Sequence, residues 1–130
     1  MSTKKNILVV DDDIDFLDQI ALTMKADGYN VTTAQGQEEA EDAMLTAIPD
    51  LAILDLMMEN MDSGFVLCHH IKKIYPATPV IILTAVEAET GMDFKARCSE
   101  AASWVKADAM MHKPVLPEQL RSEVRRLLRA

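Results

Sequence analysis

Short apolar runs recur along the chain, and a polar or charged residue directly follows most of them. The clearest runs are Ile7–Val10, Leu51–Leu54, Val80–Leu83 and the shorter Ala109–His112. Continuous apolar runs of this length are typical of strands that are buried on both faces, as in the centre of a parallel sheet. The run Asn30–Ala34 is less apolar and rich in β-branched residues, so it predicts a strand at an edge of the sheet.

Helical periodicity fills the intervals between these runs. The first helix should follow the Asp11-Asp12-Asp13 run and end at Asp27-Gly28, because glycine is a helix stop signal. Further helices are expected over Gln37–Ala47, over Phe65–Tyr75 and after Pro117. Strands therefore alternate with helices along the chain.

This alternation predicts an α/β fold with a doubly wound, five-stranded parallel sheet. Right-handed crossovers place helices on both faces, and the flavodoxin-like strand order 2-1-3-4-5 puts the first and third strands side by side. We expect the segment between Thr84 and Ala109, whose pattern is the least legible, to form either an enlarged fourth helix, which would begin near Phe94, or a lid. Residues 1–130 should form one domain, because a chain of this length is the size of one domain.

Acidic residues that follow the strands should meet at one edge of this sheet. Asp11 and Asp12 follow the first strand and Asp55 ends the third, and the carboxyl ends of parallel strands lie together. Close carboxylates repel, by about 4 kcal/mol per pair at 4 Å and an effective dielectric constant of 20, so the site needs positive charge. Mg²⁺ prefers oxygen ligands and can supply that charge, as can Lys113 after the last strand.

A carboxylate in such a site can act as a nucleophile. Held beside a metal ion and an ammonium group, the carboxylate of Asp55 would stay ionised and could attack phosphorus to form an acyl phosphate. Thr84, at the end of the fourth strand, would add a hydroxyl donor to one phosphoryl oxygen.

Four short motifs together resemble the receiver domain of two-component response regulators. They are Val9-Val10-Asp11-Asp12, Asp55-Leu56-Met57-Met58, Thr84-Ala85 and Lys113-Pro114. The resemblance covers essentially the whole chain. It implies that Asp55 is the phosphoacceptor, that Thr84 is the switch hydroxyl and that Lys113 binds the phosphoryl group.

The same resemblance implies a Mg²⁺ site. Asp12 would be a direct ligand, Asp11 a ligand largely through water, and Asp55 and the backbone carbonyl of Met57 would be further ligands. The implied function is in signalling: the chain would take phosphoryl from a histidine kinase or a histidine phosphotransfer protein and switch a protein-binding face towards a protein target. A phosphorylation-dependent dimer is compatible with this function.

Two other functions compete with this interpretation. A receiver-like module that only binds partners and is never phosphorylated would have the same fold. A phosphatase of the haloacid dehalogenase type is disfavoured, because it needs a second aspartate two residues after the nucleophile, where this chain has Met57. Beyond self-phosphorylation from phosphodonors and self-dephosphorylation, we expect no enzyme activity.

Three features depart from the usual receiver pattern. The stretch Glu59-Asn60-Met61-Asp62-Ser63-Gly64 stands where Pro-Gly-Met-Asp-Gly is common, so the proline is lost and one residue is gained. Met110 stands where receivers usually have an aromatic residue, three positions before the lysine. A switch that depends on the rotamer of an aromatic side chain is therefore not expected at this position. The span from Thr84 to Lys113 is also longer than usual.

Some nearby residues have simpler explanations. Asp13 should cap the first helix with its side chain, and His69 and His70 should be surface or boundary residues. A solvated arginine stripe is expected on the last helix, made of Arg121, Arg125 and Arg129.

Charge and composition indicate which classes of partner and which cellular compartment to expect. With 21 acidic residues against 13 basic ones, the net charge of −8 argues against direct binding of nucleic acid. Cys68 and Cys98 are too few for a disulfide framework or a zinc site, which fits a reducing cytosol. The sequence has no signal peptide pattern and no stretch long enough to cross a bilayer, so a cytoplasmic location without membrane contact is expected.

Overall fold

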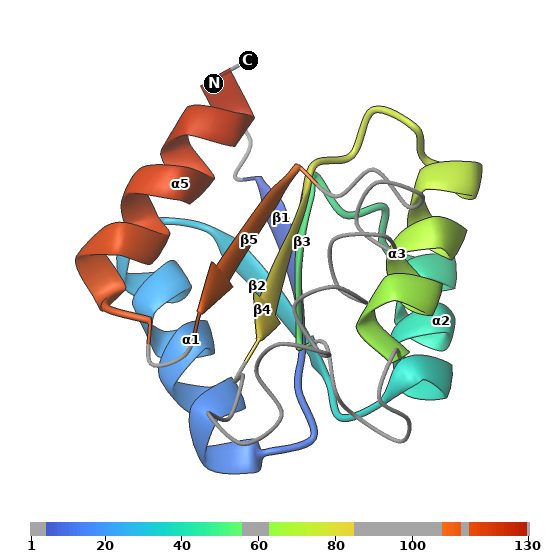
Figure 1. Ribbon diagram of the computed structural model, residues 1–130, viewed down its shortest axis with the longest axis horizontal. Coiled ribbons are helices and arrows are strands. Elements are labelled where there is room, and N and C mark those ends of the chain that lie inside the picture. Colours follow the sequence, from blue (N-terminus) through green and yellow to red (C-terminus); the bar gives the residue numbers. More distant parts are fainter. Residues whose placement is uncertain (1–4, 56–62, 85–107, 113–114, 130) are drawn as a thin grey trace, which may run out of the picture.

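The computed structural model describes residues 5–55, 63–84, 108–112 and 115–129, of which 63–65, 112 and 129 are described by their backbone alone. Their strands form one parallel sheet in the order β2-β1-β3-β4-β5 (Figure 1). The strands are β1 (Asn6–Val10), β2 (Asn30–Ala34), β3 (Leu51–Asp55), β4 (Val80–Thr84) and β5 (Ala109–His112). The predicted fold class and strand order are confirmed, and β2 is an edge strand as expected.

Helices cover both faces of the sheet. Those within the described ranges are α1 (Ile14–Ala26), α2 (Gln37–Thr46), α3 (Ser63–Ile74) and α5 (Pro117–Arg129). Figure 1 shows α1 and α5 on one face and α2 and α3 on the other. The expected helix from Phe94 lies outside the described residues. Within those ranges, every helix is too short or too polar to span a lipid bilayer.

Alternate side chains of the strands build a separate core on each face. In β1, Ile7 and Val9 pack with residues of α1 and α5, whereas Leu8 and Val10 pack with residues of α2 and α3. Every residue of β3 and β4 is buried, which matches the continuous apolar runs of these strands. Each fully buried Leu or Ile side chain contributes roughly 1.5–3 kcal/mol, so these two central strands anchor both cores.

Helix α1 begins and ends at the residues that the sequence predicts, an aspartate cap and a glycine stop. The carboxylate of Asp13 accepts hydrogen bonds from the backbone N–H groups of Asp15 at 3.1 Å and Phe16 at 3.3 Å. This confirms the predicted N-cap, which satisfies amides that have no partner inside the helix. Gly28, just after the helix, has φ +95°, a conformation that glycine adopts without strain.

Four helix boundaries differ from the prediction, and the smallest difference is the end of α3 at Ile74 instead of Tyr75. α3 begins at Ser63 instead of Phe65, because residues of low helix propensity are tolerated in a first turn, where the N–H groups need no intrahelical acceptor. α5 begins at Pro117 itself, since proline suits the first helical position. α2 ends at Thr46, and Ala47 is already extended with φ −148°.

Two aspartates at the amino end of the sheet join neighbouring strands. Asp50, just before β3, donates its N–H to the Asn6 carbonyl at 2.7 Å and accepts the Asn6 N–H on its carboxylate, also at 2.7 Å. Asp108, just before β5, makes the same pair with Val80, at 3.0 and 2.8 Å. We call these two arrangements the strand clasps. Lys72 of α3 strengthens the second, with its Nζ 2.6 Å from the Asp108 carboxylate.

Candidate functional site

The pairing of β1 with β3 brings acidic residues together at the carboxyl edge of the sheet. Val10 lies opposite Leu54, so Asp11 and Asp55 are the next residues along two adjacent strands. Asp11, Asp12 and Asp55 each offer a carboxylate oxygen, and these oxygens all lie within 4.8 Å of one another. The juxtaposition predicted from the sequence is therefore confirmed.

These three carboxylates differ in their exposure to water. Asp11 is 1% exposed and Asp55 6%, whereas Asp12 is open to solvent. Grouped carboxylates that are partly removed from water favour a bound cation, because ionised groups in the interior must be paired or coordinated. A set of carboxylate oxygens with one side open to solvent suits a hard divalent cation that keeps several waters, as Mg²⁺ does. The residues present therefore fit the metal that the sequence implied.

Asp13 contributes to the site in a way that the sequence analysis missed. Its backbone N–H donates to Oδ1 of Asp11 at 2.9 Å, so it helps to orient that carboxylate while its own side chain caps α1. An aspartate that accepts from the amide two residues later is a common local turn. The Asp11-Asp12-Asp13 spacing carried this signal, which was interpreted only as a helix cap.

Thr84 lies at the same edge of the sheet and has a buried hydroxyl. Asp55 pairs with Leu83 of β4, so Thr84 is one residue farther along. Its side chain is 2% exposed, and within the described part of the chain Oγ1 has no hydrogen-bond partner. Leaving a buried hydroxyl unsatisfied costs about 1–3 kcal/mol, so such a group marks a place for a ligand oxygen or a water.

Two predicted site residues cannot be placed in the same way. Met57 and Lys113 lie outside the described residues. Thr84 is paired with His112, and Lys113 follows His112 in the sequence, but its role stays a prediction.

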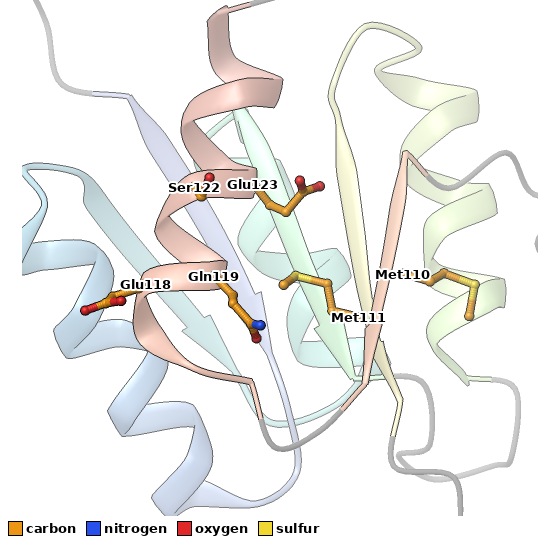
Figure 2. A pocket seen from close by; sticks show the side chains of 6 residues that line it. All are labelled: Met110, Met111, Glu118, Gln119, Ser122 and Glu123. Carbon is orange, nitrogen blue, oxygen red and sulfur yellow. The ribbon is translucent and has the colours of Figure 1, made fainter.

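A separate groove runs between β5 and α5. Its volume is about 660 Å³, and its described lining residues are Met110, Met111, Glu118, Gln119, Ser122 and Glu123. Figure 2 shows Met110 pointing away from α5 and Met111 pointing towards it. Met110 packs against the core on the α2 and α3 side, so the side chain that replaces the usual aromatic residue is partly buried.

Other polar candidates have structural partners. His70 contacts Glu41 of α2, with Nδ1 3.0 Å from Oε2, and both side chains are near the surface as expected for this histidine. Arg125 is exposed, as predicted for the solvated stripe, and it also makes an ion pair. Its guanidinium donates two hydrogen bonds to Asp27, at 2.6 and 3.2 Å, and thereby holds α5 against the end of α1.

Cys68 is an unreactive core residue. Its side chain is fully buried in α3, and burial raises the pKa of the thiol to about 11. A thiol with this pKa is protonated at neutral pH and is a poor nucleophile or metal ligand.

Known proteins that are similar to this chain belong to a family in keeping with the acidic cluster at the carboxyl edge of the sheet. A family model described as the response regulator receiver domain matches residues 7–125. The alkaline phosphatase synthesis transcriptional regulatory protein PhoP of Bacillus subtilis is 31% identical over 129 residues, which cover 96% of this chain and 49% of that protein. The chain thus spans about half the length of the curated relatives that it matches.

Solved structures give the same result. A CheY-like response regulator receiver domain protein from Methanospirillum hungatei JF-1 has a TM-score of 0.84 and 27% identity, with 98% of this chain and 95% of that chain covered. The response regulator protein TrrA from Thermotoga maritima, solved in complex with Mg²⁺-BeF, has a TM-score of 0.77 and 29% identity, with coverages of 95% and 98%. The fold, the acidic cluster and these matches together identify the chain as a member of the response regulator receiver domain family.

Proposed function

We propose that this chain is a phosphoacceptor receiver, in which Asp55 takes a phosphoryl group from a histidine kinase or a histidine phosphotransfer protein in the presence of Mg²⁺. The observation that carries the proposal is the buried Asp55 carboxylate, whose oxygen lies within 4.8 Å of those of Asp11 and Asp12. The Mg²⁺-BeF complex of TrrA supports the choice of cation.

The reaction transfers one phosphoryl group between two proteins. A carboxylate oxygen of Asp55 attacks phosphorus and forms a P–O bond, while the P–N bond to the donor histidine breaks and its electron pair stays on the imidazole nitrogen. The product on this chain is an acyl phosphate. Asp55 is only 6% exposed and ends β3, so we expect the phosphoryl group to approach it from the carboxyl edge of the sheet.

Four groups would hold the cation at this edge. They are the carboxylates of Asp11 (largely through water), Asp12 and Asp55 and the backbone carbonyl of Met57. A bound Mg²⁺ would neutralise negative charge on the phosphoryl oxygens and on the carboxylates. The N–H of Asp13 donates to the Asp11 carboxylate and helps to orient it towards the site.

Thr84 and Lys113 would bind the remaining phosphoryl oxygens. The Thr84 hydroxyl donates a hydrogen bond, which gives its buried Oγ1 the partner that the described residues do not supply. The Lys113 ammonium pairs with another oxygen. Movement of Thr84 towards the phosphoryl group would then alter the protein-binding face and report phosphorylation to a protein target.

The proposal also covers the domain content, the enzyme activity, the cellular location and the oligomeric state of the chain. Residues 1–130 would be one receiver domain, without enzyme activity beyond self-phosphorylation from phosphodonors and self-dephosphorylation. The kinase or phosphotransfer partner places it in the cytoplasm, and a phosphorylation-dependent dimer fits the same role. Direct contact with nucleic acid is not proposed, because a net charge of −8 is repelled by a phosphate backbone.

Intact mass spectrometry tests this proposal. The wild-type protein, incubated with MgCl₂ and acetyl phosphate, should gain the mass of one phosphoryl group, and chelation of Mg²⁺ should prevent the gain. Asp55→Asn should gain nothing, because an amide is neither anionic nor nucleophilic. Asp18→Asn, which alters an exposed carboxylate on α1, is the matched control and should behave like the wild type.

The outcomes separate the two functions considered for this fold. Phosphorylation that persists in Asp55→Asn would reject the assignment of the phosphoacceptor. A wild-type protein that is folded and binds Mg²⁺ but is never phosphorylated, by acetyl phosphate or by a phosphorylated phosphotransfer protein, would favour a receiver-like module that only binds partners.

A further inference from the structure

The charged residues of α2 and α3 are of opposite sign. α2 contains Glu38, Glu39, Glu41 and Asp42 and no basic residue. α3 contains Lys72, Lys73 and two histidines and no acidic residue. A surface with one acidic half and one basic half is complementary to a second copy of itself.

The two helices lie side by side on one face of the sheet (Figure 1). Two contacts bridge them, from His70 Nδ1 to Glu41 Oε2 at 3.0 Å and from the Tyr75 hydroxyl to the Met44 carbonyl at 3.3 Å. These contacts fix a continuous surface on which residues of both helices can meet one partner.

Charged side chains on this surface remain available to a partner. Lys72 is turned towards Asp108, with its Nζ 2.6 Å from the carboxylate, so it belongs to a strand clasp. Asp42 and Lys73 are both exposed, and no ion pair joins either to another described residue. Asp42 on the acidic helix and Lys73 on the basic helix are therefore available for an external contact.

An apolar cluster lies at one end of the same surface. Leu45 is 84% exposed, Ile48 60% and Ile74 57%. Ile74 is the last residue of α3, and the next residue, Tyr75, donates its hydroxyl to the carbonyl of Met44, which precedes Leu45 in α2. Near the same ends of the two helices, Thr78 Oγ1 donates to the Pro49 carbonyl at 2.9 Å. Single exposed apolar side chains are ordinary, whereas a group of them beside complementary charges indicates a binding surface.

We propose that this α2–α3 surface, defined by Asp42, Leu45, Ile48, Lys73 and Ile74, binds a second copy of the chain. Both helices run from the carboxyl end of the sheet back to its amino end, so they point the same way. In the dimer, a twofold axis would run parallel to the two helices, between the two copies. It would pack α2 of each copy against α3 of the other. Acidic residues then face basic ones in both halves, and each apolar cluster meets its copy.

The proposed dimer is separate from the phosphoacceptor site. Its apolar cluster lies where α2 and α3 end, next to the start of β3 and β4, whereas Asp55 is at the opposite end of β3. It should therefore form with or without a phosphoryl group. Two short helices make a small interface, at the low end of specific protein contacts, so a dissociation constant in the micromolar range or weaker is expected.

Sedimentation equilibrium over a wide range of protein concentration tests the proposal. The wild-type protein should show a monomer–dimer equilibrium that weakens as salt is added, because charge contacts are screened. Leu45→Glu should weaken the dimer at least tenfold. Leu22→Glu is the matched control, since Leu22 is 67% exposed on α1, and it should leave the dissociation constant unchanged.

A charge exchange tests the orientation of the two copies. Asp42→Lys and Lys73→Glu should each weaken the dimer, because like charges would then face each other across the axis. The double variant should recover most of the wild-type affinity. Circular dichroism establishes that each variant is folded.

Three results would overturn the proposal. The first is a wild-type protein that is monomeric at every concentration, even if the same variants abolish binding to a different protein. The second is a dimer that is insensitive to Leu45→Glu, which would place the interface elsewhere. The third is a double variant that fails to recover, which would exclude the twofold packing of α2 on α3.

Discussion

Three consecutive aspartates at the end of β1 have three different environments. Asp11 is buried and accepts a hydrogen bond, Asp12 is exposed, and Asp13 caps α1. The strand, the turn and the helix start assign these environments, although the three side chains are chemically identical. A substitution at each position should therefore disturb a different property of the molecule.

Asp12→Ala and Asp13→Ala should separate metal binding from helix capping. We expect Asp12→Ala to lower Mg²⁺ affinity by at least about tenfold, since even partners outside the first coordination shell commonly contribute that much. Asp13→Ala keeps the backbone N–H that holds Asp11 and should change Mg²⁺ affinity little, while it lowers the free energy of unfolding by about 1 kcal/mol. Calorimetric titration and urea denaturation measure the two effects. Equal losses of Mg²⁺ affinity would show that the roles of these aspartates are assigned wrongly.

Burial of Cys68 predicts a pH dependence of stability. Burial raises the pKa of this thiol from 9.0 to about 11, so the folded state holds its proton more tightly than the unfolded state. The resulting stabilisation is complete below pH 9 and is lost as the pH rises through 11, by at most about 2.7 kcal/mol at 1.36 kcal/mol per pKa unit. Urea denaturation over this range, compared with Cys68→Ala, measures the loss. An equal alkaline loss in the variant would assign it to other groups.

Strands were the elements that the sequence predicted best. Leu51–Leu54 and Val80–Leu83 have no polar residue to interrupt them, and the structure buries all of these positions. The edge strand was predicted from its weaker apolar character, and β2 is indeed only partly buried. The site followed from the same pattern, because strand order alone brings Asp11 and Asp55 to one edge.

Contacts between distant residues could not be predicted from the sequence. Asp50 and Asp108 have the composition of turn residues, and their partners Asn6 and Val80 are 44 and 28 residues away. Only the register of the strands brings these groups together. The ion pair of the exposed Arg125 could not be predicted for the same reason, since its partner Asp27 is 98 residues away.

The strand clasp of Asp108 should contribute more to stability than that of Asp50. Asp108→Ala removes the acceptor of both the Val80 N–H and the Lys72 ammonium, and we expect a loss of about 1–3 kcal/mol in the free energy of unfolding. Lys72→Met removes only a partly exposed ion pair and should cost at most about 1 kcal/mol.

Urea denaturation of Asp108→Ala, Asp50→Ala and Lys72→Met measures this ranking. If Lys72→Met costs as much as Asp108→Ala, the ion pair matters more than the acceptor for the Val80 amide, and the role given to the clasp is wrong.

For the whole molecule, the acidic cluster couples folding to Mg²⁺. The cation should bind the folded chain, where the carboxylates are assembled, so rising MgCl₂ should raise the melting temperature more than NaCl of equal ionic strength. Asp55→Asn should raise stability without Mg²⁺, because it relieves repulsion, and should respond less to the cation. Differential scanning calorimetry measures both trends. A melting temperature that responds equally to both salts would argue against a metal site in the cluster.

The strand clasps also bear on how the amino end of the sheet opens. An amide at the first residue of a strand normally exchanges its hydrogen with water as the end of the strand frays. Here the amides of Asn6 and Val80 are each held by a carboxylate from the neighbouring strand. Exchange at these two amides therefore requires at least that the carboxylate let go of the amide, so both should exchange more slowly than strand-end amides without such an acceptor.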